Sequence, residues 1–206
     1  MAMAPKVIQD SMDAVLRIGL RYLWVDRYCI IQDDEQGQHH QIRQMGLIYP
    51  NAFLTIIATA GKGPEHGLRG VRNTPKNPQP RLNIENEECL AHICRPSPSL
   101  IEGSKWTTRA WTYQEELFSR RRLYFTDKQV VFECRSMRRI ESLDISFDSK
   151  RPRWRGLNSG QPRTDNNMST SGRDNAMHYI SEYSKRQISF PTDKINAIQG
   201  VLHAFV

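Results

Sequence analysis

The stretch that decides the fold is Phe53–Ala58, FLTIIA, in which apolar side chains fall on both faces of an extended chain. Such a strand is expected at the centre of a sheet that is covered on both sides. Upstream, residues 7–19 and 38–49 repeat apolar side chains at helical spacing, and residues 22–25 form a short apolar run typical of a buried strand. The order helix, strand, helix, strand predicts an α/β fold with a partly parallel central sheet flanked by helices.

Each of these two helices has an expected inward face and an expected end. Facing inward we expect Ile8, Met12, Val15 and Leu16 in the first helix, and Ile42, Met45 and Tyr49 in the second. Gly19 follows the first pattern and is typical of a helix end, and Pro50 is expected to break the second helix.

Downstream of the central strand, residues 60–80 are rich in Gly and Pro and predict a connector, and residues 107–118 predict a helix. A β-hairpin is predicted from residues 122–126 and 129–134, with its turn at Asp127-Lys128. Leu90–Cys94 is a further short strand candidate.

The last third of the chain changes character. Residues 135–172 are polar and rich in Arg, Ser, Asn and Gly, so we expect a long mobile insertion there. Two C-terminal helices follow, over residues 175–187 and from Thr192 onward. Their expected inward residues are Ala176, Ile180 and Tyr183 in the first, and Ile195, Ile198, Leu202 and Phe205 in the second.

Length and composition fit a single globular domain over residues 1–206. The formal net charge of +7 permits anionic partners without identifying one. Four cysteines in a chain of this length do not make a disulfide scaffold. No signal-peptide pattern and no apolar run of roughly 20 residues is visible, so we expect a reduced, cytoplasmic protein without a membrane span.

The segment Arg109–Glu115, RAWTYQE, carries the candidate site. In a helix Trp111 and Glu115 are four residues apart and share a face. A carboxylate beside an indole forms either a packed structural corner or the wall of a small-molecule site. Arg109 is then either an anion binder or a partner of a carboxylate, and Gln114 either orients a neighbour or lies on the helix surface.

Asp26 is a second candidate, because it ends the run 22–25 predicted as a strand. Ligands of α/β folds gather at the carboxyl ends of strands, whereas an Asp in this place also commonly caps a turn. We predict no metal site, because Cys89 and Cys94 lack the spacing of a paired-cysteine zinc motif. The basic run Lys150–Arg155 contains a Trp, which allows a nucleic-acid-binding alternative.

Three blocks of the sequence resemble the heterokaryon-incompatibility (HET) domain of filamentous fungi. The first is Tyr22–Asp34, YLWVDRYCIIQDD, which is similar to the family's LWIDALCINQDD block. The second runs from Met45 through Ala58 to Gly67-Leu68. The third is RAWTYQE with the strand that ends at Glu133-Cys134. The family's upstream block, Y.ALSYVWG, has no counterpart. We therefore expect either a fragment or a shortened gene product that lacks the first sheet strand, and a C-terminal sensor domain can also be missing.

The resemblance implies a role in non-self recognition, innate immunity and programmed cell death. HET domains are also distantly similar to Toll/interleukin-receptor (TIR) domains, some of which cleave NAD with a Glu four residues after a Trp. Trp111 and Glu115 have this spacing, which implies Glu115 as the catalytic residue, NAD as a substrate, and Asp26, Arg109, Trp111 and Gln114 as ligand-binding residues. The alternative is a non-catalytic module that acts through protein partners or self-association.

Overall fold

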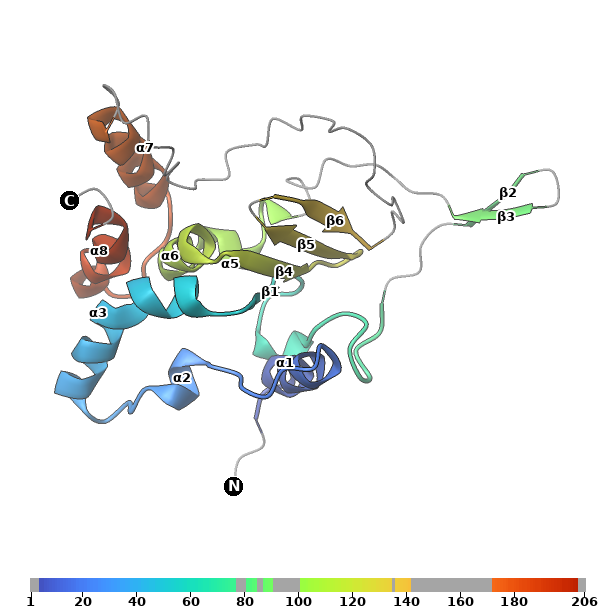
Figure 1. Cartoon of the computed structure of the whole chain (residues 1–206), viewed down its shortest axis with the longest axis horizontal. Coiled ribbons are helices and arrows are strands. Elements are labelled where there is room, and N and C mark those ends of the chain that lie inside the picture. Colours follow the sequence, from blue (N-terminus) through green and yellow to red (C-terminus); the bar gives the residue numbers. More distant parts are fainter. Residues whose placement is uncertain are drawn as a thin grey trace. The chain divides into compact units, whose positions relative to one another are not determined.

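The computed structural model describes residues 4–76, 81–84, 87–90, 101–134, 136–141 and 172–203 (Figure 1). The chain divides into two compact units. The first unit is formed by residues 1–23, 56–105 and 122–151, and the second by residues 24–55, 106–121 and 152–206. The predicted α/β class is confirmed, because a mixed sheet with a parallel pair is combined with helices and followed by C-terminal helices.

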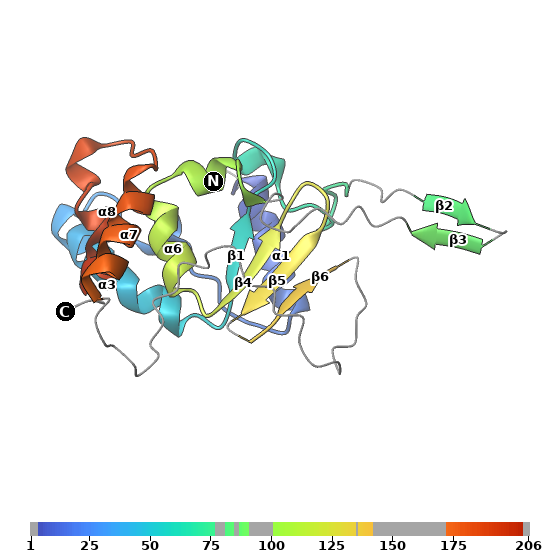
Figure 2. The same cartoon turned by 90° about the horizontal axis from the view of Figure 1, so that it is seen from above.

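The first unit contains a four-stranded sheet in the order β1-β4-β5-β6 (Figure 2). Its strands are β1 (Thr55–Ala58), β4 (Arg121–Phe125), β5 (Val130–Cys134) and β6 (Arg138–Ile140). The predicted strand is confirmed, although it begins two residues later than expected. Its predicted central position was wrong: β1 lies at the edge of this sheet and pairs with β4 on one side, and of its four residues only Ile57, at 1% exposure, is buried. Strands β5 and β6 pair antiparallel, with Phe132 opposite Arg139.

The hairpin between β4 and β5 is confirmed, including its turn at Asp127-Lys128. The Thr126 hydroxyl donates to the Gln129 carbonyl at 2.7 Å and accepts the Gln129 N–H at 3.1 Å, which closes the turn. Because this tight turn makes β4 and β5 antiparallel, the parallel pair of the sheet is β1 with β4. Strand β6 lies within the segment expected as a mobile insertion; residues 142–171 of that segment lie outside the described residues.

A second, two-stranded sheet pairs β2 (Arg81–Ile84) antiparallel with β3 (Glu87–Leu90). The strand expected over Leu90–Cys94 therefore begins earlier, and its residues after Leu90 lie outside the described residues. The same holds for the basic run Lys150–Arg155.

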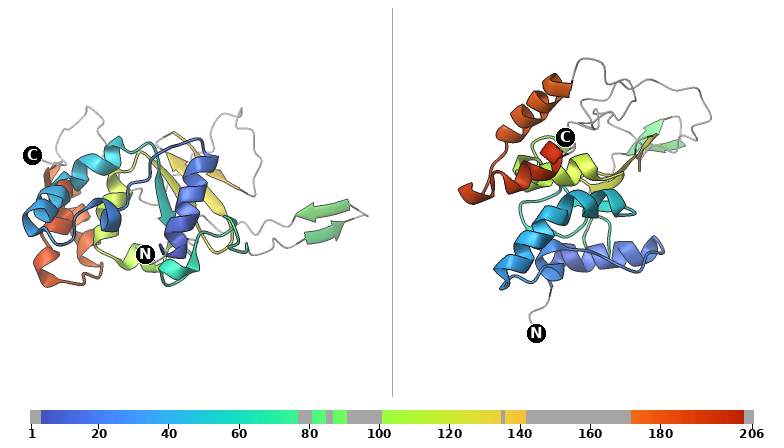
Figure 3. Two further views of the ribbon diagram at one scale, coloured as in Figure 1. Left: turned by 90° about the horizontal axis from the view of Figure 1, so that it is seen from below. Right: turned by 60° about the vertical axis from the view of Figure 1, so that its left-hand side comes forward.

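Helix α1 (Lys6–Arg17) packs beside the four-stranded sheet (Figure 3), and Gly19 follows it at φ +84°, as predicted. Ala14 contacts a core cluster that includes Leu68, Val71 and Phe125. The predicted inward face was wrong in part, because Met12 is 54% exposed and Leu16 is 67% exposed. Val15 is buried as predicted, and the buried face is completed by Asp10, Ser11 and Ala14 in place of Met12 and Leu16.

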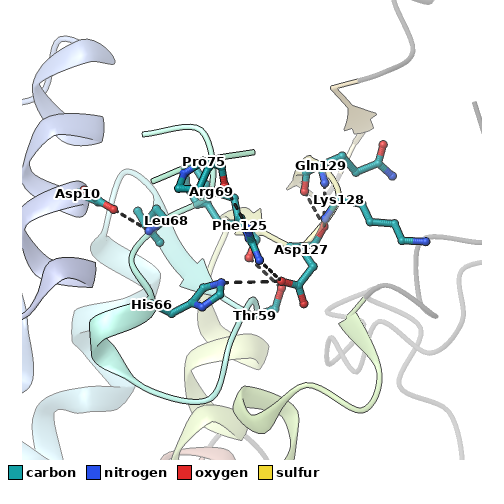
Figure 4. A network of polar contacts seen from close by, with 11 residues as sticks. Asp10, Thr59, His66, Leu68, Arg69, Pro75, Phe125, Asp127, Lys128 and Gln129 are labelled. Atoms are coloured by element: carbon teal, nitrogen blue, oxygen red, sulfur yellow. Dashed lines mark hydrogen bonds and ion pairs between the residues drawn. The ribbon is translucent and has the colours of Figure 1, made fainter. Parts of the chain in front are cut away.

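Helix α1 buries the face that carries Asp10 because this carboxylate accepts hydrogen bonds from buried donors; the bond from Leu68 is drawn in Figure 4. Its Oδ2 accepts the Leu68 N–H at 2.8 Å and the Thr74 hydroxyl at 2.6 Å. Gly67, at φ +75°, brings the loop close to this carboxylate, since a Cβ there would lie 2.4 Å from Oδ2. The connector after β1, which contains η1 (Pro64–His66), is thus pinned to α1 by one carboxylate oxygen.

The second unit is helical, with α2 (Asp26–Cys29), α3 (Glu35–Asn51), α5 (Lys105–Thr108), α6 (Trp111–Phe118), α7 (Gly172–Ser184), η2 (Pro191–Asp193) and α8 (Asn196–His203). The strand predicted over residues 22–25 was wrong. The Val25 carbonyl instead accepts the N–H groups of Tyr28 and Cys29, and the Val25 N–H donates to Cys29 Sγ at 3.4 Å. These hydrogen bonds begin α2, and residues 22–25 are not paired in a sheet.

Three helix predictions needed correction. Helix α3 runs through Pro50 to Asn51, because a proline in the last turn gives up only one helical bond, and the Ala52 N–H still reaches the Ile48 carbonyl. The expected helix over 107–118 is interrupted between α5 and α6, where the Ala110 N–H bonds the Gln187 carbonyl at 2.8 Å. In α7, Tyr179 is buried and Tyr183 packs against the same core as predicted, whereas Ile180 is 37% exposed.

The core of the second unit joins α6, α7 and α8 through Tyr113, Leu117, Tyr179, Ile198 and Val201. Ile198 and Leu202 therefore face inward as predicted, whereas Ile195 precedes α8 and is 72% exposed. The predicted face of α3 is confirmed for Met45 and Tyr49, both of which are buried. In the part of the chain that is described, no helix combines the length and the apolar character needed to cross a bilayer.

Asp10 should be essential to the first unit. We expect Asp10→Ala to lower the free energy of unfolding by about 3 kcal/mol, because the Leu68 N–H and the Thr74 hydroxyl are left buried without their acceptor. Asp13→Ala on the same helix breaks only a partly exposed pair with Arg17 and should cost about 0.5 kcal/mol. Urea unfolding measures both; equal losses would contradict the role given to Asp10.

Glycines in α3 and α8 give a matched pair for the second unit. A Cβ on Gly200 would lie 2.8 Å from Gln114 Oε1 and 3.1 Å from Phe118 Cε2, whereas a Cβ on Gly46 would lie 3.6 Å from the Gly200 Cα. We expect Gly200→Ala to destabilise by about 1–2 kcal/mol through overpacking. Gly46→Ala should be neutral or stabilise by up to about 1 kcal/mol, since alanine favours helix. Thermal unfolding would contradict this packing if the order were reversed.

Candidate functional site

Glu115 and Trp111 lie on one short helix, α6, in the second unit. The predicted i, i+4 relation is therefore realised. Trp111 is partly buried and packs against the cluster of Ile30, Met45 and Tyr49, which joins α3 to the end of α2. Trp24 packs against the same cluster and meets the Tyr49 ring edge-to-face, with the ring centroids 6.1 Å apart. The Glu115 helix thus borders a group of aromatic rings.

The Glu115 carboxylate bonds to two neutral donors. Trp106 Nε1 donates to Glu115 Oε2 at 3.3 Å, and the Tyr49 hydroxyl also hydrogen-bonds the carboxylate. Trp106 belongs to α5, and it reaches Glu115 because the chain bends between α5 and α6. The pairing of Glu115 with an arginine, which is the structural alternative expected from sequence, is not what the described residues show: Glu115 is bonded by an indole and a phenol.

Burial raises the pKa of Glu115 above its ordinary value of 4.5 and is the largest contribution. The indole hydrogen bond from Trp106 opposes it, the negative charge of Asp26 raises the pKa further, and the charge of Arg109 and the bond from Tyr49 lower it. The net effect is upward. Glu115 is therefore a carboxyl group that holds its proton to a higher pH than a solvated glutamate.

The pKa of Tyr49 is shifted by the same neighbouring groups. Its pKa is raised, first by burial and then by the negative charges of Glu115 and Asp26, with Arg109 acting in the opposite direction. The phenol accordingly stays protonated and serves as a donor to Glu115. The charges of Asp26, on α2, and Arg109, at the α5–α6 bend, therefore act on both Tyr49 and Glu115.

Three other residues predicted for the site differ from one another in burial and in their hydrogen-bond partners. Asp26 is exposed at the first position of α2, and its Oδ1 accepts the Arg27 N–H at 2.6 Å. Arg109 is exposed at the bend, where its backbone forms a parallel bridge with Gln187. Gln114 points elsewhere: it is 2% exposed, and its Nε2 donates to the Asn196 carbonyl at 3.0 Å, which fastens α6 to α8.

The start of α6 is held by Arg186, which follows α7. Its guanidinium bonds Glu116 Oε2 at 2.9 Å and Thr112 Oγ1 at 3.3 Å, and it lies over the Tyr113 ring at 4.5 Å. The Gln187 N–H donates to the Thr108 carbonyl at 2.6 Å. These contacts fix the bend that sets Trp106 against Glu115.

Sequence reasoning assigned no site role to Trp24, Tyr49 or Trp106. Tyr49 was recognised only as part of the inward face of its helix. Trp106 stands nine residues before Glu115, a separation that gives no common face on one continuous helix, so periodicity could not reveal it. Among the described residues, no group of His, Cys, Asp or Glu is arranged to hold a metal ion.

The family model for heterokaryon incompatibility protein (HET) matches residues 1–115, which is more than half of the chain and ends at Glu115. The chain belongs to the HET family. The resemblance seen in the sequence is thereby confirmed, and the HET domain links this protein to heterokaryon incompatibility. No curated protein and no solved structure gave a significant match to this HET chain.

The pKa of Glu115 leads to a stability prediction with a definite sign. Because the folded state holds the proton more tightly than the unfolded state, the stability of the wild type falls as pH rises from about the ordinary value of 4.5 through the raised pKa. Glu115→Gln stays neutral and keeps an acceptor for Trp106. Its melting temperature should lack this decline and should equal or exceed that of the wild type at pH 7.5.

Glu116→Gln, one residue along the same helix, is the matched control. It removes one charge of the pair with Arg186, so it should lose about 1 kcal/mol at pH 7.5. Scanning calorimetry at several pH values measures both variants. A loss of stability in Glu115→Gln as large as that in Glu116→Gln would mean that Glu115 is a structural anchor.

Proposed function

We propose that this HET domain contributes to incompatibility as a death-inducing module that binds and cleaves NAD at a site centred on Glu115. The observation that carries the proposal is the environment of this carboxyl group, which has a raised pKa, two neutral donors and a border of aromatic rings. A half-buried carboxyl group whose pKa is shifted, and which is held by neutral donors, marks a candidate functional site.

The chemistry that this environment suits is cleavage of an N-glycosidic bond. The bond between C1′ of the ribose and N1 of nicotinamide breaks, its electron pair goes to N1, and neutral nicotinamide leaves. Water adds to C1′ and loses a proton, which yields ADP-ribose. An ionised Glu115 would hold the ribose hydroxyls or stabilise the positive charge that develops at C1′.

In this proposal, the neighbours of Glu115 bind the other parts of the NAD molecule. Trp111 and Trp24 offer aromatic faces for a planar ring, as aromatic residues do in many small-molecule sites. Arg109 is exposed and can pair with the pyrophosphate, and Asp26 can accept a ribose hydroxyl. A cationic nicotinamide ring beside Glu115 favours the ionised carboxylate, so binding of the substrate would itself lower the pKa that burial raises.

The proposal is tested by incubating the pure chain at high concentration with NAD and following nicotinamide release. We expect turnover by the wild type and at least a ~100-fold loss in Glu115→Gln, because the amide cannot carry the negative charge. The rate should rise with pH through the raised pKa of Glu115, since the ionised form is the active one.

Glu102→Gln is the control, since Glu102 is exposed and lies in the first unit. It should keep the wild-type rate. Equal turnover by the wild type and Glu115→Gln, or none by either, would contradict the catalytic role. If neither protein releases nicotinamide, the HET domain acts as a non-catalytic interaction module.

A further inference from the structure

Two consecutive glutamates on α6 have different partners. Glu116 Oε2 forms an ion pair with the Arg186 guanidinium at 2.9 Å, and the two side chains are 26% and 14% exposed. Glu115 is bonded by the Trp106 indole and the Tyr49 phenol instead. The ion pair occupies the guanidinium with the second glutamate, so the first keeps its neutral donors.

A buried hydroxyl connects Arg186 to the Trp106 side of the site. Thr112 is 1% exposed, and Arg186 Nη1 donates to its Oγ1 at 3.3 Å. The Thr112 hydroxyl in turn lies 2.6 Å from the Trp106 carbonyl oxygen and 2.7 Å from that of Arg109. A guanidinium is only a donor, so its bond leaves the hydroxyl proton for these carbonyls, and hydrogen bonds in such a chain polarise one another.

Trp106 is therefore held at two places. Its carbonyl accepts the Thr112 hydroxyl, and its indole Nε1 donates to Glu115 Oε2 at 3.3 Å. Thr112 and Glu115 are three residues apart on α6 and are neighbours on the helix surface. With its carbonyl fixed and its side chain buried, Trp106 has little freedom to turn the indole away. The contact at the carboxylate thus depends on a hydroxyl one turn earlier in α6.

We propose that Thr112 and Arg186 are positioning residues of the Glu115 site. Together they hold the Trp106 indole on the carboxylate. Arg186 follows α7 and lies beyond residues 1–115, which the family model matches, so a segment outside the match controls whether the site is assembled. The catalytic consequence rests on the function proposed for Glu115, whereas the chain of contacts can be tested without it.

The pH dependence of the site reports on this chain of contacts. The indole bond lowers the pKa of Glu115, against the rise that burial causes. Loss of the bond should therefore raise this pKa further. The other groups that act on the pKa are Asp26, Tyr49 and Arg109, on α2, on α3 and at the bend, and no variant used here changes them.

Nicotinamide release from NAD tests the positioning in catalysis. Thr112→Val removes the hydroxyl at nearly constant volume. We expect it to lower kcat at least ~10-fold with little change in KM, because the carboxylate is misplaced in the bound complex, and to move the pH profile upward. Thr112→Ser keeps the hydroxyl and should restore the wild-type pH profile. Arg186→Lys keeps the charge beside Glu116 without the guanidinium fork, and should move the profile in the same direction by less.

Thermal unfolding at several pH values tests the same contacts without NAD. The folded-state pKa of Glu115 is raised, so its contribution to stability is complete below the ordinary value of 4.5 and is lost as pH rises through the raised pKa. In Thr112→Val this decline should extend to higher pH. The double variant with Glu115→Gln should lack the decline, which assigns it to this carboxyl group.

The outcomes separate the positioning role from NAD cleavage. If the wild type releases no nicotinamide, the catalytic proposal fails and the unfolding curves decide the positioning role. An upward shift in Thr112→Val that Thr112→Ser reverses and Glu115→Gln abolishes supports it. A loss of stability that is equal at every pH, an equal shift in Thr112→Ser, or a shift that persists in the double variant would overturn it. If Thr112→Val does not fold, Arg186→Lys decides by the same criteria.

Discussion

The bend between α5 and α6 is the constraint on which the candidate site depends. Residues 109–110 leave the helical path because the backbone of Gln187 takes the hydrogen bonds of Thr108 and Ala110. Arg186 holds the first turn of α6 through Thr112 and Glu116. Without this bend, Trp106 and Glu115 would stand on one longer helix at positions that do not face each other. With it, the indole N–H reaches the carboxylate.

The same constraint explains why Glu115 carries a raised pKa. A carboxylate on a helix surface would be solvated, or would pair with a nearby arginine. Here it meets an indole, a phenol and the charge of Asp26, while Arg109 acts only as an opposing charge. Burial with neutral donors costs stability when the group ionises. Such a cost is typical of a site kept for function, and it is the physical basis of the NAD-cleaving role proposed for this HET domain.

Some expectations from sequence failed for a shared reason. Residues 22–25 have the composition of a strand, yet the Val25 carbonyl starts a helix. Met12 and Leu16 have helical spacing with Ile8, yet α1 turns Asp10 inward because that carboxylate has buried donors in a loop more than fifty positions away. Hydrophobic pattern records which residues prefer to be buried. It does not record where a distant backbone group needs an acceptor.

The sequence by itself determined the α/β class, the strand at β1 though not its place at the edge of the sheet, the hairpin turn at Asp127-Lys128 and membership of the HET family. These follow from local apolar periodicity, turn chemistry and ordered motifs, which are properties of neighbouring residues. Only the tertiary structure decided that Trp106 and Tyr49 bond Glu115, that Gln114 serves the packing of α8, and that α1 exposes Met12 and Leu16. Each of these depends on hydrogen bonds and packing between segments far apart in the chain, which local pattern cannot encode.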